Sequence, residues 1–94
     1  MRITGIIWLE DVVDKLASKH NIATDEVEEA LRASRRFRFI ETGDVVGEDL
    51  YASLIQTAAG RYLVVYFVYK TTGEALIISA RNMTKKEKRT YAKK

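Results

Sequence analysis

The sequence has no cysteine, no proline and only one histidine among its 94 residues. Without cysteine the chain forms neither disulfides nor thiolate metal sites, so core burial must supply most of its stability, and a reducing, cytoplasmic setting is expected. A single histidine excludes an acid–base pair of two histidines within one chain. Histidines and carboxylates do not cluster with the spacing of metal ligands, so we expect no metal and no other cofactor.

Long apolar runs and export signals are also missing. The longest apolar run, residues 62–69, is far shorter than the roughly 20 residues that a transmembrane helix needs. The N-terminus lacks the basic-then-apolar pattern of a signal peptide, and we expect no membrane partner. With 47% apolar residues the chain has enough material for one core, which predicts a single domain over residues 1–94.

The two parts of the chain carry opposite charge. Residues 1–60 contain 7 basic and 11 acidic side chains, whereas residues 61–94 contain 9 basic and 2 acidic ones. The basic part favours a polyanionic partner, because neutralising each phosphate releases counterions, and the acidic part could face a basic partner. The alternative is that the terminal lysines only solubilise a short helix.

Apolar spacing predicts two helices that follow a short strand over residues 3–8. Apolar side chains recur every three or four positions over residues 8–20, and Asn21 ends this helix. Thr24 is the expected N-cap of the second helix, because acidic residues follow it in the first turn, and residues 35–36 close it.

From Phe37 onwards the period changes to two, which is typical of strands. Strands are predicted over residues 50–57, 61–70 and 75–81, and their short glycine-containing connections indicate antiparallel hairpins. Residues 62–69 are apolar on both faces, which places that strand in the middle of the sheet. We therefore expect an α+β fold in which two N-terminal helices and a short C-terminal helix pack on a mainly antiparallel sheet.

A basic helix is predicted directly after the last strand. Residues 84–87 match the capping box, with Thr84 as N-cap. Free backbone N–H groups and the positive end of the helix dipole lie there beside Arg81, which outlines an anion site. The helix is too short and too polar to be stable alone, and Tyr91 is its candidate anchor on the sheet.

Strand register brings two arginines to one end of the predicted sheet. If residues 61–70 pair with 74–81, Arg81 lies opposite Val64, roughly 10 Å along the strand from Arg61. Both side chains could then reach one phosphate. The same register puts Arg61 and Val64 on opposite faces, so a one-residue bulge is needed for the two arginines to converge.

Residues spread over most of the chain resemble the pattern of a known family. They run from a tryptophan near the N-terminus to the strand–helix junction at the C-terminus: Trp8, Lys19, His20, Asn21, Ile22, Gly60, Arg61, Leu63, Val64, Val65, Ile77, Ile78, Ser79, Ala80, Arg81, Thr84, Glu87, Arg89 and Tyr91. This pattern is similar to that of the BrnT toxins of bacterial type II toxin–antitoxin systems. The chain departs from the family in having Leu9 after Trp8. It also has acidic residues before Leu50, where the family has an arginine-rich stretch.

The resemblance implies a small cytoplasmic ribonuclease with a RelE-like α+β fold that halts translation by cutting mRNA. It also implies a cognate antitoxin, a small DNA-binding protein that holds the toxin inactive in a hetero-oligomer. Metal-independent cleavage by the 2′-hydroxyl requires that this oxygen be aligned with the phosphorus. It also requires neutralisation of the charge on the pentacovalent phosphate, for which the arginine fork is suited.

We expect Arg61 and Arg81 to bind the phosphate in the transition state, with Lys19 as an auxiliary cation. His20 is the candidate general acid or base, although packing explains its place on the apolar stripe equally well. Tyr91 could orient the 2′-hydroxyl or stack on a base while its ring docks the helix. The other C-terminal cations are expected to steer RNA towards the site: Lys85, Lys86, Lys88 and Arg89.

A second hypothesis is a non-catalytic module, a degenerate toxin that binds RNA or protein with its basic C-terminal face. Alanine substitution of the arginines separates the two, because an enzyme loses cleavage whereas a binder cleaves no RNA and only loses affinity. A DNA-binding regulator is less favoured, since the turn after Lys19 leads into an acidic helix that would repel DNA phosphates.

Overall fold

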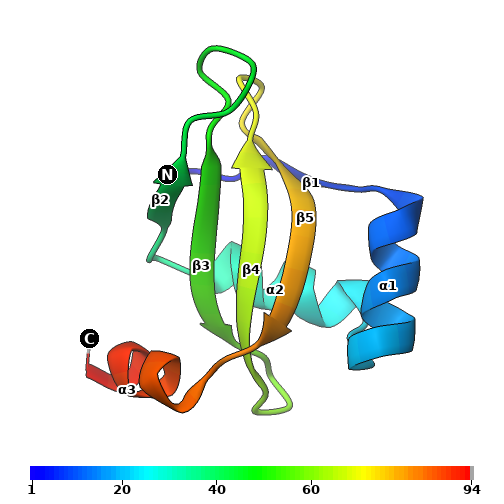
Figure 1. The fold of residues 1–94 in the computed structure, drawn as a ribbon, viewed down its shortest axis with the longest axis vertical. Helices are drawn as coiled ribbons and strands as arrows, with labels where there is room; N and C mark the ends of the chain where they lie inside the picture. Colours follow the sequence, from blue (N-terminus) through cyan, green and yellow to red (C-terminus); the bar gives the residue numbers. More distant parts are fainter. Residues whose placement is uncertain (94) are drawn as a thin grey trace.

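The computed structural model describes residues 1–93. One five-stranded sheet has the strand order β1-β5-β4-β3-β2, and its neighbours are antiparallel except for the parallel pair β1 and β5. The predicted α+β fold with a mainly antiparallel sheet is therefore confirmed (Figure 1). The elements are β1 (Gly5–Trp8), α1 (Glu10–His20), α2 (Thr24–Ala33), β2 (Arg38–Glu41), β3 (Leu50–Gln56), β4 (Tyr62–Tyr69), β5 (Glu74–Asn82) and α3 (Lys85–Lys93).

The helices pack on both faces of the sheet. The larger core lies between the sheet and the two N-terminal helices and includes Leu16, Val27, Leu31, Leu63, Val65, Phe67 and Ile77. A smaller cluster on the opposite face lies under α3 and contains Ala52, Val64 and Met83. We call these two sides the α2 face and the α3 face. Within residues 1–93 no helix has the length and apolar character that crossing a bilayer requires.

The central strand β4 supplies both cores. Leu63 and Val65 are fully buried on the α2 face, and Val64 between them is 2% exposed on the α3 face. Successive side chains of a strand point to opposite faces, so an apolar run without alternation is stable only where both faces are covered. The predicted central position of residues 62–69 is thus confirmed.

The boundaries of the first two helices follow from local backbone chemistry. Asn21 has left-handed backbone angles (φ 51°) and its N–H donates to the Leu16 carbonyl, so it ends α1 as predicted. The prediction of Thr24 as the N-cap of α2 is wrong by one residue. The extended residue Ala23 takes that position without a side-chain cap, and the Glu26 carboxylate accepts its N–H at 3.0 Å, which is one half of a capping box.

Arg61 ties the turn between α1 and α2 to the start of β4. Its guanidinium donates to the carbonyls of His20 (2.9 Å) and Asn21 (2.6 Å), which lie at the end of α1. It also pairs with Glu26 at 3.0 Å. Carbonyls at a helix C-terminus lack partners within the helix, and a cation there also complements the helix dipole. Arg61 therefore stabilises the junction of three elements.

The C-terminal helix α3 begins at the predicted capping box. The Glu87 N–H donates to the Thr84 hydroxyl at 3.1 Å, and the Thr84 N–H donates to the Glu87 carboxylate at 2.8 Å. The Tyr91 ring packs edge-on against Tyr62 at 5.9 Å between centroids. Tyr91 therefore anchors α3 on the sheet, as its position in the sequence predicts.

Replacing Arg61 with alanine removes the hydrogen bonds to the α1 carbonyls and the pair with Glu26. Hydrogen bonds to charged groups contribute roughly 1.5–3 kcal/mol, and this side chain is partly exposed, so we expect a loss of about 2 kcal/mol in the free energy of unfolding. Urea denaturation followed by circular dichroism measures this loss. The control Arg32→Ala, at an exposed position of α2, should change stability by less than about 0.5 kcal/mol. Equal losses for both variants would contradict the proposed role of Arg61.

Candidate nucleic-acid interface

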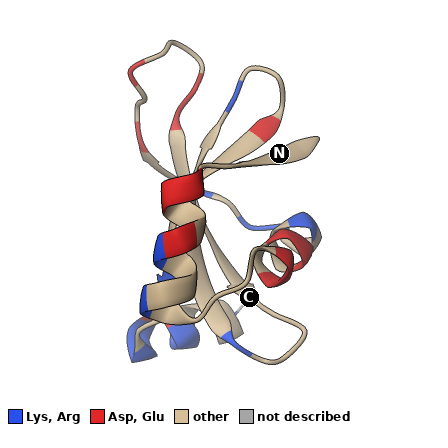
Figure 2. Ribbon diagram, turned by 90° about the vertical axis from the view of Figure 1, so that its right-hand side faces the viewer, with Lys and Arg blue, Asp and Glu red and all other residues tan. Residues whose placement is uncertain are grey.

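Charge is unevenly distributed over the molecule (Figure 2). Acidic residues gather on the loop between β2 and β3, on α2 and in the first turn of α1, whereas α3 is predominantly basic. A second basic stretch runs from the segment after α2 into the first residue of β2, where residues 35–38 include three arginines. Among residues 1–93 these arginines have no carboxylate partner, because the ion pairs there are Arg61–Glu26, Lys70–Glu48 and Arg81–Glu87.

A groove of about 400 Å³ crosses the α3 face between these two basic segments. Arg35, Arg36 and Arg38 line one wall, and α3 forms the other. The floor comes from β3 and β4 and carries the half-buried ring of Tyr66. A groove with free arginines beside an aromatic ring suits single-stranded nucleic acid, because phosphates pair with the cations and bases stack on rings.

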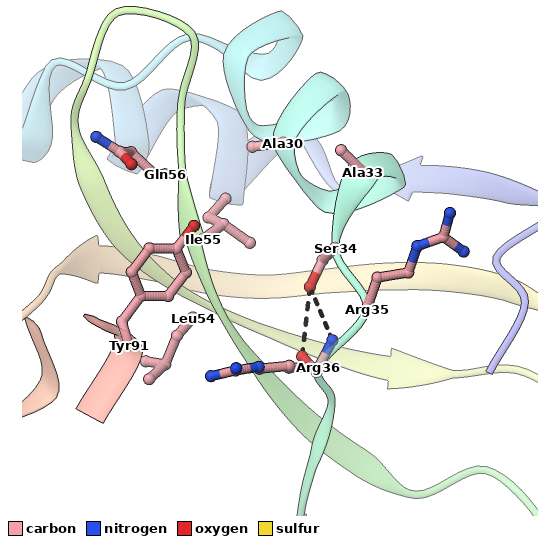
Figure 3. A pocket seen from close by; sticks show the side chains of 9 residues that line it. All are labelled: Ala30, Ala33, Ser34, Arg35, Arg36, Leu54, Ile55, Gln56 and Tyr91. Atoms are coloured by element: carbon pink, nitrogen blue, oxygen red, sulfur yellow. Dashed lines mark hydrogen bonds between the residues drawn. The ribbon is translucent and has the colours of Figure 1, made fainter. Parts of the chain in front are cut away.

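A second hollow of about 360 Å³ continues this groove around the outer edge of β3 (Figure 3). It lies between the C-terminal end of α2 and the Tyr91 ring of α3. Figure 3 shows the Arg36 side chain extending towards Leu54 and Tyr91, while Arg35 points away from them. Arg35, Arg36 and Leu54 line both hollows, so the two adjoin each other.

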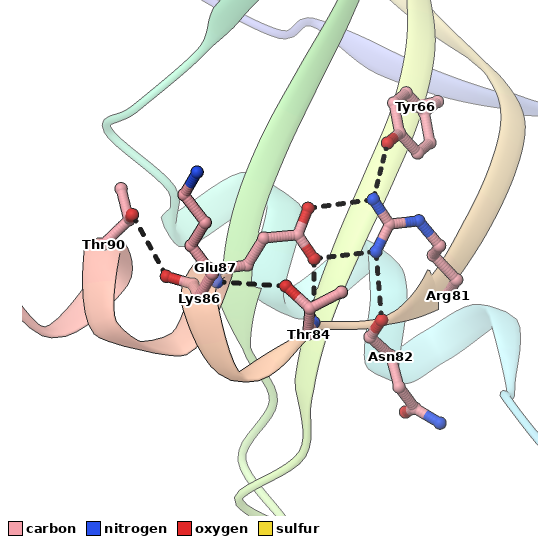
Figure 4. Close-up of polar contacts among 7 residues, drawn as sticks. All are labelled: Tyr66, Arg81, Asn82, Thr84, Lys86, Glu87 and Thr90. Atoms are coloured by element: carbon pink, nitrogen blue, oxygen red, sulfur yellow. Dashed lines mark hydrogen bonds and ion pairs between the residues drawn. The ribbon is translucent and has the colours of Figure 1, made fainter.

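Arg81 bonds two residues that line the groove, Glu87 and Tyr66, in a network of charged and polar groups (Figure 4). Its two Nη atoms donate to the two carboxylate oxygens of Glu87 at 2.7 and 2.8 Å. One of them also donates to the Tyr66 hydroxyl at 2.9 Å, and the guanidinium lies 5.7 Å from the centre of that ring. This bidentate pair links β5 to α3 and holds Tyr66 in place.

The network shifts the ionisation of both charged partners. The hydrogen bond to Glu87 is the main reason that the pKa of Arg81 is raised above its ordinary value. The hydrogen bond from Arg81 is likewise the main cause that lowers the pKa of Glu87 from 4.5 to about 2, and the Thr84 N–H lowers it further. Both groups are therefore charged at neutral pH.

The two arginines singled out by strand register do not converge. Arg81 does lie opposite Val64, as predicted. The register shift between β4 and β5 falls between Tyr66 and Phe67, beyond Val64, so it does not bring Arg61 to the same face. Arg61 turns to the helices on the α2 face, whereas Arg81 pairs with α3, and the expectation of a shared phosphate site is wrong.

The structure does not bring Lys19 and His20 to the groove either. Both belong to the last turn of α1, where the His20 carbonyl accepts from Arg61. The His20 side chain is half-buried and lines a small hollow of about 90 Å³ between α1 and β5, together with Leu16 and Ala80 of the α2-face core. Among residues 1–93 no three histidine or carboxylate side chains lie close enough together to hold a metal ion.

The predicted steering cations lie on α3, and two of them line a hollow beside Tyr91. Lys85, Lys86, Lys88 and Arg89 are all exposed on α3. The Lys88 ammonium lies 5.5 Å from the centre of the Tyr62 ring, and both Lys88 and Arg89 line a further hollow beside Tyr91. Their position agrees with a role in attracting an anion, which remains a prediction.

Sequence reasoning missed the arginines of residues 35–38 and the hydroxyl of Tyr66. It assigned the first two arginines to the end of a helix and Tyr66 to the sheet alone. A signal was present, because three arginines around Phe37 within four residues form a basic and aromatic stretch without a neighbouring carboxylate. Their shared groove depends on tertiary packing, which spacing along the chain does not reveal.

Glu87→Gln should destabilise the protein in a pH-dependent way. Because folding lowers the pKa of Glu87 from 4.5 to about 2, its carboxylate contributes stability above about pH 4.5, and this contribution is lost as the pH falls towards 2. The difference in unfolding free energy between wild type and Glu87→Gln should therefore be large near neutral pH and shrink over that interval. Urea titrations across this range measure it, with the exposed Glu29→Gln as control. A difference that stays constant or grows in acid would contradict the pairing.

Comparison with known proteins places this geometry in a functional context. The family model described as ribonuclease toxin, BrnT, of type II toxin-antitoxin system matches residues 8–87. The matched range extends from the end of β1 to the first turn of α3 and contains the Arg81–Glu87 pair. A search of curated proteins found no match. The chain belongs to the BrnT family of ribonuclease toxins of type II toxin–antitoxin systems.

Proposed function

We propose that the groove on the α3 face binds and cleaves mRNA, and that cleavage is metal-independent and halts translation. Family membership implies an RNA substrate and a protein antitoxin. The observation that carries the assignment to this groove is that Arg35, Arg36 and Arg38, which lack carboxylate partners among residues 1–93, line it together with Tyr66.

Binding is explained by the chemistry of the groove walls. Arg36 and Arg38 neutralise phosphates, while the rings of Tyr66 and Tyr91 offer surfaces on which bases stack. The basic helix α3 raises the local concentration of RNA through its long-range field. Tyr91 combines this role with docking, since its ring contacts Tyr62 and also lines the hollow.

Cleavage follows from the placement of the Tyr66 hydroxyl. The RNA 2′-oxygen attacks phosphorus and loses its proton to solvent, and the bond from phosphorus to the 5′-oxygen breaks. Tyr66 accepts a hydrogen bond from Arg81, so its own proton remains available for the leaving 5′-oxygen. Arg36 stabilises the added charge on the pentacovalent phosphate. Arg81 acts as a positioning residue through Tyr66.

The antitoxin in this proposal is a small DNA-binding protein that holds the toxin inactive in a hetero-oligomer. The site of action is the cytoplasm, where mRNA is translated. The geometry gives no support to a catalytic role for Lys19, His20 or Arg61, because these residues lie at the end of α1 and on the α2 face. They are left out of the proposed mechanism.

Tyr66→Phe is the sharpest test, because it removes the hydroxyl and keeps the ring. We expect kcat on single-stranded RNA to fall by about 100-fold with little change in KM, as is typical for loss of a general acid. Arg81→Ala should lower kcat comparably, and translation arrest on expression should be relieved in both variants. The matched control His20→Ala, on the opposite face, should retain wild-type cleavage.

Cleavage assays in the presence of EDTA complete this test. Activity that persists with the chelator supports metal independence, whereas activity that disappears contradicts it. Loss of cleavage in His20→Ala together with full activity in Tyr66→Phe would place the chemistry on the α2 face and contradict the proposal. A wild-type protein that binds RNA but cleaves none would instead be the non-catalytic module.

The salt dependence of RNA binding tests the arginines separately from catalysis. Each phosphate contact on a single strand contributes about 0.7 to the slope of log Kobs against log salt concentration. Replacing Arg36 and Arg38 with alanine should therefore reduce the slope by about 1.4. Fluorescence anisotropy with a 2′-O-methylated RNA, which cannot be cleaved through its 2′-oxygen, measures it. The control Arg32→Ala should leave the slope unchanged, and an unchanged slope in the double variant would exclude these contacts.

A further inference from the structure

The outer edge of β3 is open along its second half. The neighbouring strand β2 pairs with β3 only at Leu50, Tyr51 and Ala52. Within residues 1–93, no strand pairs with the outer edge of β3 at residues 53–56. An uncovered strand edge presents unpaired backbone donors and acceptors, and is a template on which another strand can pair.

The direction of the backbone groups along this edge follows from two hydrogen bonds. The Thr57 N–H donates to the Arg61 carbonyl, and the Tyr69 N–H donates to the Asp49 carbonyl. Residues of β3 with odd numbers therefore point their N–H and C=O groups at β4, and the alternation of an antiparallel ladder turns Leu54 and Gln56 outwards. Within residues 1–93 no hydrogen bond engages their outward groups.

A hollow, which we call the slot, lies beside this edge, and Figure 3 shows the side chains that line it. Ala30 and Ala33 of α2 border it on the α2 face, and their small side chains leave it open. Leu54 and Tyr91 border it on the other face. The open edge of four residues is roughly 13 Å long. The hollow beside it has a volume of about 360 Å³, which accommodates a short extended segment.

The charges around the slot indicate the composition of its occupant. Arg35 and Arg36 lie at one end. At the other end Lys88 and Arg89 line the adjoining hollow together with Gln56. A strand that carries acidic side chains and small apolar ones complements this slot. A nucleic acid could pair with the cations but has no regular row of amide donors and carbonyls to match the edge.

We propose that an extended, acidic segment of the antitoxin pairs with the β3 edge at Leu54 and Gln56 and adds a strand to the sheet. Such a strand contacts Arg36 and Tyr91, so it excludes RNA from the groove. This consequence for RNA rests on the proposed function, whereas the strand pairing itself rests only on the open edge. Inhibition is then competitive and requires no change of fold.

The test uses a synthetic peptide of four Glu-Val repeats and amide hydrogen exchange read by NMR. In the free protein the amides of Leu54 and Gln56 should exchange quickly, whereas those of Ser53 and Ile55, bonded to β4, are protected. The peptide should slow exchange at Leu54 and Gln56 at least tenfold. The same peptide with every amide N-methylated should not, and a Lys-Val version should bind at least tenfold more weakly.

A variant that fills the slot provides a second readout. Ala33→Trp, at an exposed position of α2, should reduce peptide affinity at least tenfold, and the matched control Ala17→Trp on α1 should leave it unchanged. Equal binding of the N-methylated peptide, or protection at other strands alone, would overturn the proposal. Protection of Leu54 and Gln56 by single-stranded RNA, with none by the peptide, would overturn it as well.

Competition separates this proposal from the proposed function. If both hold, the peptide raises KM for RNA and leaves kcat unchanged. Protection at the edge without any effect on cleavage would support strand pairing. It would contradict the proposal that RNA binds in the groove. Cleavage located in the groove without protection at the edge would overturn the strand pairing and leave the proposed function intact.

Discussion

The alternation of side chains along β4 decides which residues of this protein can act together. Because β4 is the central strand and is buried on both sides, a shift of one residue would exchange its two cores. This constraint holds Tyr62, Val64 and Tyr66 on the α3 face. Through the pairing of Val64 with Arg81 it also directs Arg81 to that face, so the groove depends on the register of one strand pair.

Much of the fold could be predicted because local chemistry and tertiary packing agree. The capping box at Thr84, the end of α1 at Asn21 and the central position of residues 62–69 each follow from short-range rules. The N-cap of α2 was misplaced at Thr24 because a backbone N–H was satisfied by Glu26. Sequence patterns favour hydroxyl caps, and they miss an N-cap that is marked only by the carboxylate three residues later.

The candidate site was less predictable than the fold. Arg61 and Arg81 are both arginines at strand ends, and only the three-dimensional structure shows that Arg61 caps a helix while Arg81 supports Tyr66. Residues 35–38 are separated from β4 by more than twenty positions, so no spacing rule connects them to Tyr66. The groove and the open β3 edge adjoin each other. An antitoxin segment paired with the edge would therefore block the access of RNA to the groove.

The central claim is that RNA binds the α3 face. The most direct measurement is NMR mapping of backbone amide shifts on titration with a single-stranded, 2′-O-methylated RNA, which binds without being cut. The account predicts the largest shifts at Arg36, Tyr66 and Tyr91, around the groove. Shifts concentrated at Lys19, His20 and Arg61, with the groove residues unperturbed, would contradict it.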